Sequence, residues 1–378
     1  MYLLPKPKTI KEQDGQMLLC HSTHIVMTKE VAETEMHAAK RLQEAIRQET
    51  GLILPFSVGE VREGDLSLGI AKTLPEQTYE ITIDEKGGQI SGGDGAGVLY
   101  GVETFCQIVQ QCGGILPCVQ IQDAPDMPNR GYYFDQTRGR VLKLEELKKI
   151  ADRMCRYKLN QLQLYVEHTY LFRDFSEMWR DQTPLTAEEI LELDSYCRER
   201  HIELVPSLAS FGHLCTLLST KTYGDLCEME DSWKEPFSFW NRMRYHTINV
   251  SDERSLPLIK KMIAEYMQLF SSNKFNICAD ETFCLGKYKS KKLAEERGVH
   301  RLYIDYVKEL AQFLVENGKI PMFWGDIIWN SPELMKELPE SMICLNWGYA
   351  PEQREDETRA IAQTGAVQYL CPGVCGWN

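Results

Sequence analysis

The sequence of 378 residues has no apolar run long enough for a membrane span or a secretion signal. Residues 1–6 (Met-Tyr-Leu-Leu-Pro-Lys) lack an apolar core, and no later segment approaches the roughly 20 apolar residues of a transmembrane helix. Clusters of basic residues are also missing, and the net charge is -13 with a pI near 5.2. A phosphate-binding surface needs concentrated positive charge. We therefore expect a cytoplasmic protein without membrane or nucleic-acid partners.

The 13 cysteines form no Cys-x-x-Cys pair, and their number is odd. Several of them, such as Cys106, Cys155 and Cys278, lie in apolar runs, where a reduced thiol behaves as a small hydrophobe. This pattern indicates a reducing compartment. His21 and His24 have the spacing of metal ligands, but they lie in the N-terminal domain without acidic neighbours, so we expect no metal and no other cofactor.

A cluster of helix-breaking residues at 123–128 (Asp-Ala-Pro-Asp-Met-Pro) predicts a domain boundary. Before it, helical patterns over 31–50 and 97–109 and an alternating strand at 79–83 indicate a small α/β domain over residues 1–124.

After the boundary, residues 125–378 alternate short apolar strands with helices, which predicts a parallel sheet with right-handed crossovers. This is the rhythm of a (β/α)8-type TIM barrel, although only seven strands are visible. We therefore expect a barrel that is incomplete at its C-terminus, with an open edge that a second copy of the chain would cover. The strand candidates are 131–135, 161–167, 203–209, 275–281, 321–326, 342–347 and 367–373.

Acids and tryptophans stand at the carboxyl ends of these strands, the face where barrel enzymes place their catalytic residues. The most informative segment is 275–282, an apolar run that ends in Asp280 and Glu281. Neighbouring strand residues point to opposite faces, so regular pairing should stop at Ala279 or Asp280. Tryptophans beside acids indicate a sugar site, because flat rings pack against a pyranose while acids bind its hydroxyls. The long aromatic-rich connection from 211 to 256 is expected to shape the site.

Four segments carry a more specific signal. Residues 278–282 are Cys-Ala-Asp-Glu-Thr, 211–213 are Phe-Gly-His, 323–326 are Phe-Trp-Gly-Asp, and 130–138 begin Arg-Gly-Tyr-Tyr-Phe-Asp. Together they resemble glycoside hydrolase family 20, the β-N-acetylhexosaminidases, which have Gly-Gly-Asp-Glu, Pro-Gly-His and Trp-Asp-Glu at the corresponding strand ends. The chain looks most like the cytoplasmic branch of that family, truncated before the last barrel strand.

The resemblance implies an exo-acting enzyme that removes terminal GlcNAc or GalNAc from an oligosaccharide or a small glycoside, without a cofactor. In such enzymes the 2-acetamido oxygen of the substrate attacks C1 and forms an oxazolinium ion, so the configuration is retained. The resemblance makes Glu281 the general acid and base, and Asp280 the residue that orients the acetamido group. It gives as substrate-binding residues Arg130, Trp324, Trp347, Asp326, Glu167, His213 and Trp377.

The chain departs from the family pattern at several positions. Glu167 and His168 replace an acidic pair, Asn276 replaces a histidine, and the region of Trp377 lacks the expected tyrosine. Two alternatives stay open: a non-catalytic sugar-binding protein that is inactive through truncation, and another hydrolase with a neighbouring-group mechanism on a similar barrel.

Overall fold

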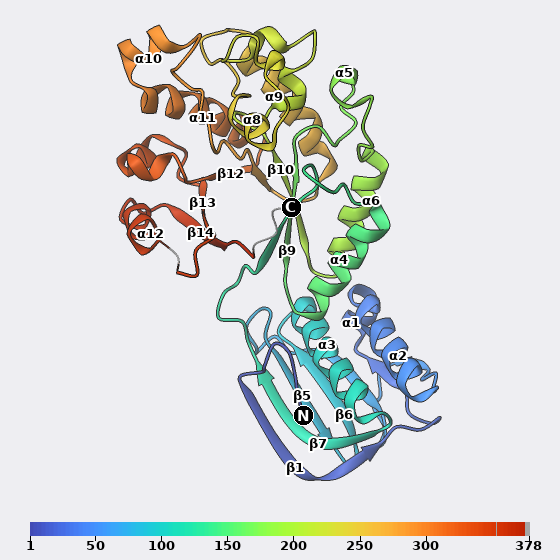
Figure 1. The fold of residues 1–378 in the computed structure, drawn as a ribbon. Helices are drawn as coiled ribbons and strands as arrows, with labels where there is room; N and C mark the ends of the chain where they lie inside the picture. The colour runs from blue at the N-terminus through green and yellow to red at the C-terminus, as the bar shows by residue number, and fades with distance from the viewer. Residues whose placement is uncertain (353, 375–378) are drawn as a thin grey trace. The chain divides into compact units, whose positions relative to one another are not determined.

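A computed structural model of the chain (Figure 1) describes residues 1–352 and 354–374. The predicted fold class is confirmed: a mixed-sheet α/β domain precedes a TIM-like domain of seven parallel strands. The chain forms two compact units, which interleave in sequence. In the part of the chain that the structure describes, no helix combines the length and apolar character needed to cross a bilayer. The first unit comprises residues 1–132, 145–162 and 195–203, and the second comprises 133–144, 163–194 and the chain from 204 onward.

The first unit is built on a mixed sheet with the strand order β1-β7-β5-β6-β4-β2-β3. Helices α2 (Met36–Thr50) and α3 (Gly95–Cys112) lie side by side on one face of this sheet (Figure 1), and Leu42 and Phe105 are fully buried there. The helix predicted over 31–50 is two helices, because α1 (Lys29–Thr34) ends at Glu35. The strands are β1 (Thr9–Leu18), β2 (Ile25–Met27), β3 (Phe56–Val58), β4 (Leu66–Ile70), β5 (Tyr79–Asp84), β6 (Gly87–Gly92) and β7 (Ile115–Asp123).

The second sheet is parallel and follows the chain in the order β14-β13-β12-β11-β10-β9-β8. Its inner strands are buried on both faces, as continuous apolar runs require. At the edge, Val367 and Leu370 of β14 are each about half exposed, at 52% and 50%. The strands are β8 (Gly131–Asp135), β9 (Gln161–Val166), β10 (Glu203–Leu208), β11 (Lys274–Asn276), β12 (Ile320–Trp324), β13 (Ile343–Gly348) and β14 (Val367–Pro372).

The helices between these strands have the signals that the sequence indicated. Thr186 and Glu189 exchange hydrogen bonds of 2.9 and 3.2 Å between side chain and backbone, which is a capping box at the start of α6. Helix α4 buries an apolar stripe that includes Leu147 and Ala151. The helices are α4 (Leu144–Arg156), α5 (Ser176–Trp179), α6 (Ala187–Arg198), α7 (Cys215–Leu218), α8 (Phe239–Arg244), α9 (Ser255–Tyr266), α10 (Lys291–Arg297), α11 (Val299–Glu316) and α12 (Glu355–Ala362).

Strand β11 ends earlier than predicted. Pairing was expected to continue to Ala279 or Asp280, whereas the strand ends at Asn276. The side chain of Asn276 explains the difference, because its Oδ1 accepts a hydrogen bond of 2.8 Å from the backbone N–H of Cys278. This local bond turns the chain, and Cys278 and Ala279 then adopt left-handed backbone angles with φ of 58° and 62°. The two acids therefore project from a turn, where the alternation of a strand no longer separates them.

Candidate active site

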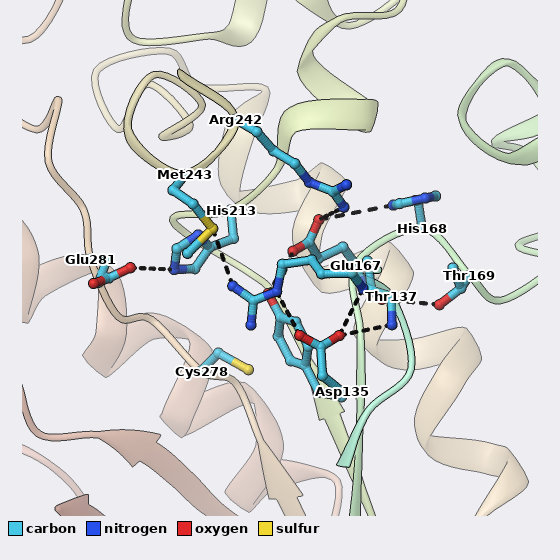
Figure 2. A network of polar contacts seen from close by, with 12 residues as sticks. Asp135, Thr137, Glu167, His168, Thr169, His213, Arg242, Met243, Cys278 and Glu281 are labelled. Atoms are coloured by element: carbon cyan, nitrogen blue, oxygen red, sulfur yellow. Dashed lines mark hydrogen bonds and ion pairs between the residues drawn. The ribbon is translucent and has the colours of Figure 1, made fainter. Parts of the chain in front are cut away.

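Asp280 and Glu281 meet at one buried histidine, His213, which follows β10. The Nε2 atom of His213 lies 3.3 Å from Asp280 Oδ2 and 3.3 Å from Glu281 Oε2, and its side chain is only 2% exposed. Figure 2 shows the imidazole and the Glu281 carboxylate facing each other. Neither contact has the geometry of a direct hydrogen bond, so the attraction between His213 and Asp280 is that of an ion pair.

His213 and Asp280 set each other's charge. Burial would lower the pKa of His213, but the charge of Asp280 and the contacts with both acids raise it to about 10. Burial would likewise raise the pKa of Asp280, but the charge of His213 lowers it below its ordinary value. At neutral pH the site therefore holds an imidazolium ion beside an ionised Asp280.

Asp326, which follows β12, contacts the chain at the two acids. Its Oδ2 accepts a hydrogen bond of 3.0 Å from the backbone N–H of Glu281, and its Oδ1 is buried and finds no partner among the described residues. Burial and the charge of Asp280 raise the pKa of Asp326 well above its usual range. Its surroundings therefore favour the neutral form of Asp326, and its observed contact holds the backbone of Glu281 in place.

The turn that presents the acids is held by close packing. Gly212 lies against it, and a Cβ atom at this position would be 2.5 Å from the carbonyl oxygen of Asp280. On another side, the hydroxyl of Tyr303 donates a 3.0 Å hydrogen bond to the carbonyl oxygen of Ala279. Glu281 is itself left-handed, with φ of 48°. Such backbone conformations are costly for residues other than glycine, and they cluster at functional sites.

A second charged cluster lies beside the acids, around Glu167 at the end of β9 (Figure 2). Arg242 of α8 donates a 3.0 Å hydrogen bond from Nη2 to Glu167 Oε2. Arg138 donates from Nε to Asp135 Oδ2 at 2.6 Å and lies 3.7 Å from Glu167 Oε1. Burial would raise the pKa of Glu167, but the charges of the two arginines lower it. The cluster places guanidinium donors near the catalytic candidates, which suits the binding of hydroxyl groups.

Arg130 does not join this cluster, contrary to our expectation. It precedes β8 and belongs to the first unit, and its guanidinium donates to the carbonyl of Lys158 at 2.9 Å, to Gln77 Oε1 at 2.9 Å and to the hydroxyl of Tyr100 at 3.1 Å. These bonds give Arg130 a structural role in that unit. Arg138, which follows the same strand, supplies a guanidinium at the site. Arg138 lies just after the carboxyl end of its strand, as the acids do, so its position in the sequence could have identified it.

The predicted aromatic residues lie on neighbouring strands. Trp324 is 7% exposed and packs edge-on against Tyr133, with ring centroids 4.9 Å apart. Trp347 is half-buried on β13 and packs against Tyr349 at 5.2 Å. Trp377 lies outside the described residues.

Among the residues that the structure describes, one group of three could offer ligands to a metal ion: His213, Asp280 and Glu281, whose ligand atoms lie within 4.8 Å of one another. A metal needs a neutral imidazole, whereas a pKa of about 10 keeps His213 protonated at neutral pH. A metal ion at this trio would therefore have to displace the proton of His213.

Acids, arginines and tryptophans at the carboxyl ends of parallel strands are the arrangement of a barrel enzyme. Two family models match the chain: "Glycosyl hydrolase family 20, domain 2" over residues 1–124 and "Glycosyl hydrolase family 20, catalytic domain" over residues 128–373. The chain belongs to glycosyl hydrolase family 20, which confirms the resemblance drawn from its motifs.

Relatives with known names agree with this assignment. The chain is 24% identical over 411 residues to a beta-hexosaminidase of Porphyromonas gingivalis, covering 99% of this chain and 50% of that protein. It is 26% identical over 310 residues to a beta-hexosaminidase of Vibrio furnissii, covering 74% of this chain and 48% of that protein. The chain thus spans about half the length of these relatives.

Solved structures show the same fold. A beta-N-acetylhexosaminidase from Bacteroides fragilis matches with a TM-score of 0.78 at 18% identity, over 97% of this chain and 74% of that one. An exo beta-N-acetylglucosaminidase from Vibrio harveyi, solved in complex with N-acetylglucosamine, matches with a TM-score of 0.80 at 19% identity, over 98% and 60%.

Proposed function

We propose that this chain is an exo-acting β-N-acetylhexosaminidase that removes terminal GlcNAc or GalNAc with retention of configuration. The main support is that Asp280 and Glu281 share His213, with one oxygen of each acid within 4.8 Å of the other. An inverting enzyme needs its two carboxylates about 6.5–9.5 Å apart, to leave room for a water molecule. The family resemblance implies that the acetamido oxygen of the substrate is the nucleophile.

The charges suggest how the two acids divide the work. Glu281 has a side chain that is 26% exposed, so it can reach both the leaving oxygen and an incoming water. It would protonate that oxygen and then take a proton from the water. Asp280, kept ionised by His213, would accept a hydrogen bond from the acetamido N–H and stabilise the positive charge of the oxazolinium ion.

Hydrolysis of aryl β-N-acetylglucosaminides tests this proposal. Glu281→Gln should lose about 10²–10⁴ in kcat on a substrate with a poor leaving group and much less on one whose leaving group needs no proton. Glu333→Gln, a change at an exposed glutamate of η5 (Pro332–Glu337), is the matched control and should keep full activity. Full activity of Glu281→Gln on the poor leaving group would rule out its role as general acid.

Other outcomes would favour the alternatives. Binding of N-acetylglucosamine without any turnover would indicate a sugar-binding protein, and turnover that resists a thiazoline inhibitor would indicate another mechanism. Loss of activity in a chelator would indicate that the trio of His213, Asp280 and Glu281 holds a metal. The cytoplasmic location, the domain boundary after residue 124 and an oligomer that covers the sheet edge stay predictions.

A further inference from the structure

Helix α8 and its flanking chain expose a group of large aromatic side chains. Trp240 is 63% exposed and Phe239 47%, and Phe283, which follows the acids, is 40% exposed. Two further exposed rings, Trp233 and Phe237, precede the helix. Isolated exposed apolar residues are ordinary, but a group of them at one place marks a binding surface.

Two of these rings, Trp240 and Phe283, contact the same cationic side chain, that of Arg244. The guanidinium carbon of Arg244 lies 5.0 Å from the ring centroid of Trp240 and 5.8 Å from that of Phe283. Trp240 and Arg244 are one helical turn apart, so their side chains are neighbours on α8. The thiol of Cys284 also donates to the carbonyl oxygen of Arg244 at 3.0 Å. We call Trp240, Arg244 and Phe283 the aromatic platform.

The platform is continuous with the candidate active site. Residues of the same helix enter the site: Arg242 binds Glu167, and the sulfur of Met243 lies 3.2 Å from Nη1 of Arg138 (Figure 2). The backbone N–H of Phe283 donates a 2.7 Å hydrogen bond to the carbonyl oxygen of Glu281. The platform is thus attached on both sides to residues that would act on the substrate.

We propose that the aromatic platform binds the sugar ring on the leaving-group side of the scissile bond. This inference rests on the proposed function, in which Glu281 protonates the leaving oxygen, so the departing part of the substrate lies beside Glu281 and Phe283. The indole and phenyl faces pack against the C–H face of a pyranose, and the guanidinium of Arg244 donates to its hydroxyls. The chain then prefers an oligosaccharide to a simple glycoside.

Two substrates with the same N-acetylglucosamine and different leaving groups test the platform: the β-linked disaccharide of N-acetylglucosamine and methyl β-N-acetylglucosaminide. Trp240→Ala and Phe283→Ala should lower the ratio of kcat/KM for the disaccharide over the methyl glycoside by about tenfold, mainly through KM. Tyr157→Ala is the matched control, because Tyr157 is an exposed ring, at 45%, in the first unit. It should leave the ratio unaltered.

An unaltered ratio in both platform variants would overturn the proposal. A change of oligomeric state in Trp240→Ala, seen by analytical ultracentrifugation together with an unaltered ratio, would show that this face binds a second copy instead. If the wild type hydrolyses neither substrate, the proposed function fails. Calorimetry of disaccharide binding then still tests whether the platform binds a sugar. Disaccharide binding that Trp240→Ala weakens about tenfold would support the platform, and equal binding by both proteins would refute it.

Discussion

Replacing His213 by glutamine removes the positive charge that lies between Asp280 and Glu281. At the observed 3.3 Å, the ion pair of His213 with Asp280 is worth about 5 kcal/mol for an effective dielectric constant of about 20. Both carboxylates are partly exposed, at 19% and 26%, and recover some hydration when the partner is lost. Breaking a buried pair costs about 3–5 kcal/mol, so we expect His213→Gln to lower the free energy of unfolding by about 3 kcal/mol at pH 7.

The pH dependence of this effect has a definite sign. The pKa of His213 is raised from an ordinary value near 6.5 to about 10, so its stabilising charge is fully present below about pH 6.5. That contribution is lost as the pH rises through about 10. The stability difference between the wild type and His213→Gln should therefore shrink from pH 7 to pH 10. On the acid side, the variant no longer lowers the pKa of Asp280, so the acid limb of the kcat/KM profile should move to higher pH.

Urea unfolding at pH 7 and pH 10 measures the first effect without requiring turnover. His168→Gln is the matched control, because His168 is buried in the same site and burial lowers its pKa, which leaves it uncharged at neutral pH. Its stability difference from the wild type should be the same at both pH values. An equal difference at pH 7 and pH 10 for His213→Gln would refute the ion pair of His213 with Asp280.

Three further predictions concern the residues around the acids. Ala279→Gly should stabilise the fold by up to about 1 kcal/mol, measured by thermal unfolding. Ala279 has a left-handed backbone with φ of 62°, which glycine adopts without strain. The greater flexibility of glycine in the unfolded chain offsets part of this gain. Arg138→Met should lower the free energy of unfolding by about 3–5 kcal/mol and weaken the binding of N-acetylglucosamine, measured by calorimetry. Arg130→Met should lower the melting temperature without weakening that binding. Asp326→Asn, a neutral isostere of a protonated aspartate, should keep the melting temperature at pH 7, and a large drop would show that Asp326 is ionised.

The barrel strands were largely predictable because each is an apolar run between helices with their own start and stop signals. The bounds of β8, β12 and β14 agree with the predicted ranges within one or two residues. β11 is shorter than predicted because the side-chain oxygen of Asn276 accepts a hydrogen bond from the backbone N–H of Cys278. The pattern of apolar residues does not predict such a local bond.

The acids and His213 could be located because the carboxyl ends of parallel strands meet at one edge of a sheet. The arginines could not be placed in the same way. Arg130 was chosen by resemblance, although it precedes its strand. Arg242 lies in the long connection between β10 and β11, whose path depends on tertiary contacts such as the one with Glu167 rather than on any periodicity.

The close approach at Gly212 limits the paths by which this site can evolve. Any side chain there would begin 2.5 Å from the Asp280 carbonyl oxygen, so every substitution would displace the acid turn, whatever its chemistry. A library that randomises the residues around the acids should therefore lose nearly all variants at position 212. The outward side of α8 has no such restriction, since Trp240 is exposed to solvent. New substrate preferences in this chain should accordingly arise through α8 while the acid turn stays fixed.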